Sequence, residues 1–299
     1  MPASRRAPLG QNFLASPSYL ARIAGEIRSA VTGGQRPDSA QAAPPKSGAA
    51  SLVVGPAPAP SADLIVEIGA GSGALTKYLL ELATPLVAVE IDAKLAESLR
   101  AALPSPLLDV VNADILKVDL RRLLEERGAR RAVVAGNLPY YITSPVLHHI
   151  FKAAGSVSDA VLLVQKEVAA RIAARAGSRE YGYLSVLCRV YSRPELCFTV
   201  PPGAFRPAPK VTSALVRLHF EPHWAAWGVD DPARFLDFVK LCFHQKRKTL
   251  LNNLAAKFGD RLRSGALARL PELRLRAEQL EPERLAALWL LLERAEAPV

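Results

Sequence analysis

The sequence is poor in cysteine, in aromatic residues and in long apolar runs. Its 299 residues include only three cysteines, Cys188, Cys197 and Cys242, which have neither the paired spacing of a zinc site nor the density of a disulfide scaffold. We therefore expect buried free thiols in a reducing compartment. The N-terminus has no apolar core of signal-peptide length, and no run is long enough to span a bilayer. These absences predict a cytoplasmic protein that does not insert into a membrane.

Basic residues, in contrast, are abundant. Lys and Arg number 38 against 28 Asp and Glu, so the formal net charge is +10 and the sequence pI is near 9.7. Such a charge is compatible with a polyanionic partner, but it is equally compatible with ordinary solubility charge. Half of the residues are hydrophobic, which is enough to bury a full core in one large domain or two unequal ones.

Composition divides the chain into four parts. Residues 1–30 form an N-terminal segment, and residues 31–62 are an Ala, Pro, Gly and Ser-rich stretch that predicts a low-complexity linker. In residues 63–221 short apolar runs alternate with helical stretches, which predicts a parallel sheet covered on both faces, a doubly wound α/β domain. Residues 222–299 contain Ala, Leu and Arg-rich helical segments without a strand signal, so we expect a small all-helical domain.

A glycine-rich turn, "VEIGAGSGALT", lies between the first predicted strand of this domain and a helix. Glycine allows positive φ and close approach of the backbone to a ligand, and the helix N-terminus offers free N–H groups. Gly69, Gly71 and Ala74 also fit the dinucleotide fingerprint, and a turn without any ligand is a third interpretation.

Acidic residues end the next two predicted strands. Glu90 in "VAVEID" can accept hydrogen bonds from both hydroxyls of a ribose, which NAD and an adenosyl cofactor share. Asp114 in "NADIL" can accept from an adenine amino group, although taken alone it fits better a residue that caps a turn. The carboxyl ends of strands in open α/β sheets bind ligands, so the three features together favour a site for an adenosine-containing cofactor.

The stretch "GNLPYY" follows the fourth strand. The side-chain carbonyl of Asn137 and the backbone carbonyl before Pro139 are two acceptors, and Tyr140 adds an aromatic face, so the group suits a planar substrate with an NH₂. Two acceptors that bind the hydrogens of an exocyclic amine aim its lone pair at an electrophile, and stacking on Tyr140 contributes roughly 1–3 kcal/mol. The alternative is a proline turn with a core tyrosine.

These motifs, in this order and spacing, resemble the S-adenosylmethionine-dependent rRNA adenine N6-methyltransferases. The stretches "GQNFL", "VQKEVAARI", "YGYLSVL" and "VPPGAFRPAPKVTSALVRL" are similar to the branch that dimethylates adenosines of small-subunit rRNA. The resemblance implies a Rossmann-like class I methyltransferase domain with a small C-terminal helical domain, and S-adenosylmethionine as cofactor.

The resemblance also implies roles for individual residues. At the cofactor it implies Asn12, Leu14, Gly69, Gly71, Glu90, Asp114 and Asn137, and at the target adenine Asn137, Pro139 and Tyr140. Phe205 is expected as a second stacking face, unless it is a loop aromatic that packs on the core.

The excess of positive charge lies near the C-terminus, with ten Lys and Arg against two acids between residues 240 and 276. Within "FVKLCFHQKRKTLLNNL", helical spacing places Lys240, His244, Arg247 and Lys248 opposite an apolar stripe. A solvated face is one interpretation, and contact with RNA phosphates is the one we favour beside an adenine site. The candidate RNA-binding residues are Lys240, Lys246, Arg247, Lys248, Arg206 and Lys210.

We therefore predict an enzyme that dimethylates N6 of two adjacent adenosines in a hairpin loop near the 3′ end of small-subunit rRNA. We expect it to act as a monomer on a 30S assembly intermediate and to need no metal. The motif "FHQKRKTLLNNL" favours this branch over the large-subunit enzymes. Large-subunit rRNA as substrate, or a non-catalytic RNA-binding assembly factor, are the alternatives. An NAD-dependent dehydrogenase is more distant, because no catalytic His or Tyr-Lys pair follows the glycine turn.

Overall fold

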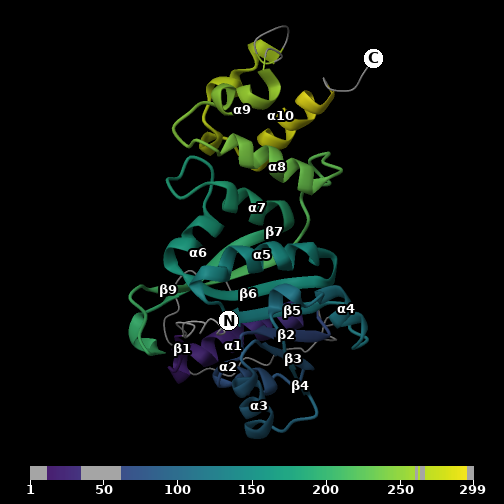
Figure 1. Cartoon of the computed structure of the whole chain (residues 1–299), viewed down its shortest axis with the longest axis vertical. Helices are drawn as coiled ribbons and strands as arrows, with labels where there is room; N and C mark the ends of the chain where they lie inside the picture. Colours follow the sequence, from purple (N-terminus) through teal and green to yellow (C-terminus); the bar gives the residue numbers. More distant parts are fainter. Residues whose placement is uncertain (1–11, 35–61, 260–261, 263–266, 295–299) are drawn as a thin grey trace, which may run out of the picture. The chain divides into compact units, whose positions relative to one another are not determined.

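The computed structural model describes residues 12–34, 62–259, 262 and 267–294 (Figure 1). They fall into two compact units. The first unit contains the described residues of 1–163 together with 200–211, and the second contains those of 164–199 together with 212–299.

The first unit is built from alternating strands and helices. Its elements are β1 (Phe13–Leu14), α1 (Pro17–Thr32), β2 (Leu64–Ile68), α2 (Ala74–Leu80), β3 (Leu86–Glu90), α3 (Ala93–Ala102), β4 (Leu108–Asn112), η1 (Ile115–Lys117), α4 (Leu120–Glu125), β5 (Ala132–Asn137), η2 (Tyr140–Ile142), α5 (Thr143–Lys152), η3 (Ala154–Ser156), β6 (Val157–Gln165), η4 (Pro202–Ala204) and β8 (Phe205–Arg206). The predicted alternation of strands and helices is confirmed for residues 63–163.

Five strands of the first unit form a parallel arrangement in the order β4-β3-β2-β5-β6. Every residue of β2 and β3 is buried, as expected where helices cover both faces of a sheet. The register aligns the strand ends: Ile68 of β2 pairs with Gly136 of β5, and Glu90 of β3 pairs with Asn112 of β4. The polar residues that end these strands therefore meet at one edge of the sheet.

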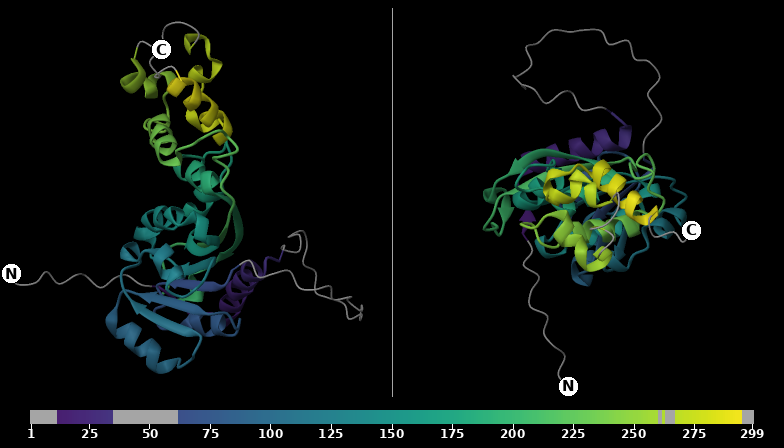
Figure 2. Two further views of the ribbon diagram at one scale, coloured as in Figure 1. Left: turned by 90° about the vertical axis from the view of Figure 1, so that its right-hand side faces the viewer. Right: turned by 90° about the horizontal axis from the view of Figure 1, so that it is seen from above.

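Helix α1, purple in Figure 2, contacts α2 and β5. Its buried residues recur at helical spacing, as in Leu20, Ile23 and Ile27, so one face packs on the core. The helix continues through Thr32 and ends at Gly33, whose φ of 69° is left-handed. The predicted linker therefore begins too early, since a helix covers its first two residues. Residues 35–61 of that segment lie outside the described part of the chain.

The second unit contains two strands and several helices. Its elements are α6 (Lys166–Ala173), α7 (Tyr183–Tyr191), β7 (Ser192–Val200), β9 (Ser213–Phe220), α8 (Pro232–Cys242), α9 (Leu250–Phe258), η6 (Leu267–Arg269), η7 (Pro271–Arg274), η8 (Ala277–Gln279) and α10 (Pro282–Arg294). Strands β9 and β7 are hydrogen-bonded neighbours, and α7, α8 and α9 pack in succession. The described residues beyond residue 222 form helices and turns, as expected for the helical domain. The same compact unit, however, also contains α6, α7, β7 and β9, which the sequence assigned to the preceding domain, so the boundary between the units does not lie at residue 221.

The predicted continuous helix with a cationic face is wrong. Helix α8 ends at Cys242 and α9 begins only at Leu250, so residues 243–249 form turns. The side chain of Asn253 holds this break: its Nδ2 donates to the carbonyls of Cys242 at 2.8 Å and Gln245 at 3.2 Å, and its Oδ1 accepts from the Gln245 N–H. A side chain that bonds backbone groups 8 to 11 residues earlier in the chain leaves no periodic pattern in the sequence, so the break could not be predicted.

Two further expectations concern cysteines and membranes. Cys188 and Cys242 are buried free thiols as predicted, whereas Cys197 is partly exposed. Burial raises the pKa of the Cys188 and Cys242 thiols, which makes them poor nucleophiles. In the described ranges, no helix is both long and apolar enough to cross a bilayer.

Candidate active site

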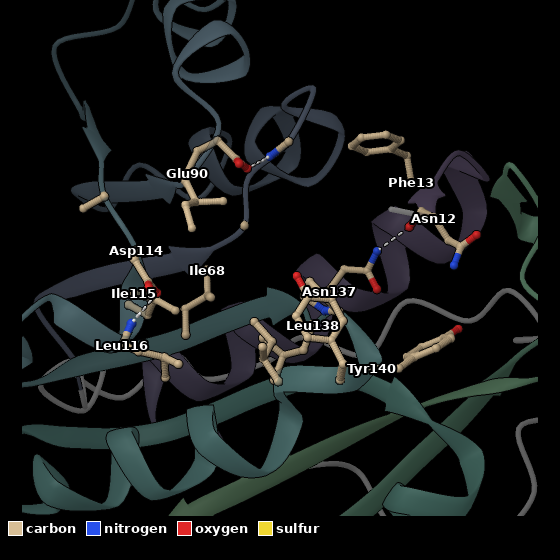
Figure 3. Close-up of a pocket in the computed structure, with 17 residues that line it drawn as sticks. Asn12, Phe13, Ile68, Glu90, Asp114, Ile115, Leu116, Asn137, Leu138 and Tyr140 are labelled. Carbon is tan, nitrogen blue, oxygen red and sulfur yellow. Dashed lines mark hydrogen bonds between the residues drawn. The ribbon is translucent and has the colours of Figure 1, made fainter. Parts of the chain in front are cut away.

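A cavity of about 350 Å³ lies at the carboxyl ends of the strands of the first unit (Figure 3). This volume is within the range of small-molecule and cofactor sites. Its lining includes six of the residues that the sequence predicts at a cofactor, namely Asn12, Gly69, Gly71, Glu90, Asp114 and Asn137, together with Pro139 and Tyr140. The sheet edge thus brings the two predicted halves of the site into one cavity.

The glycine turn after β2 requires glycine for two reasons. Gly69 and Gly71 have φ values of 69° and 56°, which L side chains adopt only with strain. At Gly71 there is also no room: a Cβ would lie 2.8 Å from Cε1 of Phe13. The ring of Phe13 therefore packs directly on the turn.

Glu90 is held in place from both sides. It is 2% exposed, and its Oε2 accepts from the Gly71 N–H at 2.8 Å while its Oε1 accepts from the Asp92 N–H at 2.9 Å. Each carboxylate oxygen can accept a further hydrogen bond. The carboxylate is thus orientated before any ligand arrives, as an acceptor for a pair of hydroxyls.

Asp114 combines the two interpretations that the sequence left open. Its Oδ1 accepts from the Leu116 N–H at 3.0 Å, so it caps the short helix η1, and it also lines the cavity. Cap and ligand contact are compatible because a carboxylate has a second oxygen.

The Asn137 side chain is orientated by the N-terminal segment. Its Nδ2 donates to the backbone carbonyl of Asn12 at 3.0 Å. A carbonyl can only accept, so this bond fixes the amide with its NH₂ toward Asn12 and leaves Oδ1 as the acceptor at the cavity. Figure 3 shows the two residues facing each other across this bond.

Gly136 allows β5 to end beside β2. A Cβ at this position would lie 2.7 Å from the carbonyl oxygen of Ile68, so any larger residue would push the strands apart. After Asn137 the Leu138 N–H donates to the carbonyl of Leu163 at 3.1 Å, and at the start of the short helix η2 the carbonyl of Pro139 accepts from the Ile142 N–H at 3.1 Å. The backbone of the "NLPY" loop is therefore anchored on β6, and Tyr140 lines the cavity from η2.

Two predicted residues lie elsewhere. Leu14 is buried and lines a smaller neighbouring cavity, and Phe205 is only 1% exposed and pairs with Leu14 between strands β1 and β8. Phe205 is not among the residues that line the larger cavity. Its predicted role as a stacking face stays a prediction, and it would require the ring to leave this buried position.

The candidate RNA-binding residues are all exposed. Arg206 and Lys210 belong to the first unit, and Lys240, Lys246, Arg247 and Lys248 to the second. Lys240 forms a surface ion pair with Asp237 and lies 5.8 Å from the ring centroid of Tyr183, whereas Lys246, Arg247 and Lys248 follow one another in the turn between α8 and α9.

Sequence reasoning missed several residues of the cavity. Phe13, Ile91 and Leu116 line it, and the last two are 47% and 37% exposed. Ile91 directly follows Glu90, and Leu116 lies two residues after Asp114, so apolar residues close to these two acids were the available signal.

Glu67 is a further buried acid near the site. It lines the smaller cavity together with Asn137, and its Oε2 accepts from the Thr76 hydroxyl at 2.7 Å. Burial, with a contribution from Glu90, raises the pKa of Glu67 to about 7, although the Thr76 hydrogen bond opposes this. At neutral pH the group is therefore partly protonated.

The parallel sheet, the glycine turn and the acids beside the strand ends define a Rossmann-like domain with a site for an adenosine-containing cofactor, as in the S-adenosylmethionine-dependent methyltransferases. A family model described as ribosomal RNA adenine dimethylase matches residues 3–274. The chain belongs to this family, and it is an rRNA adenine dimethyltransferase.

Individual relatives agree with this. Ribosomal RNA small subunit methyltransferase A of Acidobacterium capsulatum is 44% identical over 232 residues, which are 77% of this chain and 81% of that protein. The protein of the same description from Koribacter versatilis is 43% identical over 238 residues, 75% and 83% of the two chains.

Two solved structures share the fold. A dimethyladenosine transferase from Plasmodium falciparum superposes with a TM-score of 0.69 at 20% identity and covers 95% of this chain and 98% of its own. The 23S rRNA methyltransferase ErmE has a TM-score of 0.59 at 27% identity, with 93% of this chain and 99% of its own covered.

Proposed function

We propose that this enzyme dimethylates N6 of two adjacent adenosines in a hairpin loop near the 3′ end of small-subunit rRNA. We further propose that it acts in the cytoplasm, as a monomer, on an assembly intermediate of the small subunit. The observation that carries the proposal is the cavity in which Glu90 and Asp114 lie opposite the "NLPY" loop.

The cofactor half of the cavity fits an adenosyl group. The paired oxygens of Glu90 suit the two ribose hydroxyls, the carboxylate of Asp114 suits the adenine amino group, and Ile91 offers an apolar surface to the adenine ring. The turn at Gly71 lets backbone approach the ligand closely. When bound, S-adenosylmethionine supplies an electrophilic methyl group on its sulfonium.

The acceptor half binds the amine. Oδ1 of Asn137 accepts one N6 hydrogen and the backbone carbonyl of Leu138 accepts the other, which draws the nitrogen toward tetrahedral geometry and frees its lone pair. The bond from Asn137 to the Asn12 carbonyl fixes this acceptor in advance. Tyr140 stacks on the extruded base, and no metal is needed because alignment performs most of the catalytic work.

The small-subunit substrate is supported by the relatives. Those that are 43% and 44% identical act, by their names, on the small subunit, whereas ErmE, a 23S rRNA methyltransferase by name, is only 27% identical. We propose that the exposed basic residues Lys246, Arg247 and Lys248, with Lys240, Arg206 and Lys210, contact RNA phosphates.

The choice of ribosomal particle tests the proposal. Purified small and large subunits that lack the modification are incubated separately with the enzyme and labelled S-adenosylmethionine. We expect label in small-subunit rRNA only, and none with an Asn137→Ala variant. Label in the large subunit would move the substrate there, and no label in either particle would favour a non-catalytic assembly factor.

A further inference from the structure

Large apolar residues that remain exposed gather at the cavity. In the described part of the chain six such residues are exposed, and three of them, Ile91, Leu116 and Tyr141, line this cavity. Scattered exposed apolar residues are ordinary, but a group around one concave site marks a surface that a ligand covers. Tyr141 is the most exposed of the six, at 63%.

The three residues belong to different halves of the cavity. Ile91 follows Glu90 directly, and Leu116 donates its N–H to Asp114, so both lie beside the acids of the cofactor half. Tyr141 lies on η2, directly after Tyr140 and beyond the acceptor Asn137. It therefore belongs to the half that receives the nucleic acid.

We propose that Tyr141 stacks on the nucleobase next to the target adenosine. This inference rests on the proposed function, in which a base leaves its stack to enter the cavity. Extrusion exposes one face of the neighbouring base, and a second aromatic side chain can cover it. Proteins that hold single strands use this arrangement, in which successive bases stack on aromatic rings without sequence preference.

The position of Tyr141 agrees with a role in binding rather than in folding. Tyr140 and Tyr141 are consecutive, with Cα atoms about 3.8 Å apart across the peptide bond, so both rings emerge from the same short turn. Tyr140 is partly buried and lines the cavity, whereas Tyr141 is mostly in solvent. Truncation of a side chain with so little buried surface leaves the core unchanged.

Three substitutions at position 141 test the proposal in the full-length enzyme with unmodified small subunits. Tyr141→Phe keeps the aromatic ring, Tyr141→Leu keeps apolar bulk without a ring face, and Tyr141→Ala removes both. We expect kcat/KM for subunits to remain near wild type for Phe and to fall roughly 5- to 150-fold for Leu and Ala. The KM for S-adenosylmethionine and the Tm should not change in any of the three.

Ile91→Ala is the matched control, since it removes another exposed apolar side chain from the same cavity. We expect it to raise the KM for S-adenosylmethionine and to leave the KM for subunits unchanged. The stacking role would be overturned if the Tyr141→Leu variant were as active as Tyr141→Phe, or if the Tyr141→Ala variant were as active as wild type. The wild-type enzyme separates this failure from that of the proposed function: if it does not methylate small subunits at all, the substrate is wrong and not only Tyr141.

Discussion

The replacement Gly71→Ala should weaken cofactor binding more than Gly69→Ala, the same replacement at the other glycine of the turn that lines the cavity. The turn places Gly71 at a φ of 56°, and the added Cβ would lie 2.8 Å from Cε1 and 3.1 Å from Cδ1 of Phe13. A left-handed conformation costs an L residue about 1–2 kcal/mol, and the contact with the ring adds to this cost.

The structure has two ways to relieve the contact, and both disturb the site. A shift of the turn lengthens the 2.8 Å hydrogen bond from the Gly71 N–H to Glu90. A shift of Phe13 moves its neighbour Asn12, whose carbonyl holds the Asn137 amide. We expect a total loss of about 2–3 kcal/mol in cofactor binding, which raises the Kd roughly 30- to 150-fold.

Calorimetric titration with S-adenosylmethionine measures this Kd, and two further glycines provide controls. Gly69→Ala has the same backbone strain, at a φ of 69°, but its Cβ meets nothing within 4 Å. Gly25→Ala lies inside α1 with no contact and negative φ, so it should leave the Kd unchanged and stabilise the fold by roughly 0.5–1 kcal/mol. Equal Kd values for Gly69→Ala and Gly71→Ala would refute the role of the Phe13 contact.

Three further predictions concern polar side chains of the site. Asn137→Asp removes the donor to the Asn12 carbonyl and places a carboxylate oxygen next to that carbonyl, so kcat should fall roughly 10²–10³-fold. A kcat within tenfold of wild type would contradict this prediction. Glu90→Gln should raise the Kd for S-adenosylmethionine about 10- to 150-fold, because Glu90 is proposed to accept hydrogen bonds from the ribose hydroxyls. The control Glu97→Gln, on the exposed face of α3, should leave this Kd unchanged. An unchanged Kd for Glu90→Gln would contradict the proposed contact with the ribose. Glu67 has a folded pKa of about 7, above its ordinary 4.5, so its contribution to stability is complete below about pH 4.5 and is lost as the pH rises through 7, by roughly 3 kcal/mol. Urea unfolding of Glu67→Gln should therefore vary less between pH 5 and 8 than that of wild type, and equal pH profiles would contradict the raised pKa of Glu67.

The parts of the site that could be predicted from the sequence are those written into single strands and turns. Glycines directly after a strand, and acids at strand ends such as Glu90 and Asp114, are local signals, and parallel topology brings strand ends together. The "NLPY" loop could also be recognised, because its four residues are consecutive and come at the end of a single strand.

What the sequence could not show are contacts between distant segments. The Asn12 carbonyl and Asn137 are 125 residues apart along the chain, and β1 and β8, which bury Phe205, are strands of two residues without any periodicity. The break between α8 and α9 likewise depends on one side chain, Asn253, which satisfies backbone groups of the preceding turn. Periodicity continues through such a break because the apolar residues on both sides remain buried.

The most direct test of the central claim is to identify the modified nucleosides and their positions. The enzyme is incubated with S-adenosylmethionine and unmodified small subunits, and the rRNA is then digested and its fragments are analysed by mass spectrometry. We predict N6,N6-dimethyladenosine at two adjacent positions near the 3′ end. Methyl groups at other positions, or on bases other than adenine, would contradict the claim.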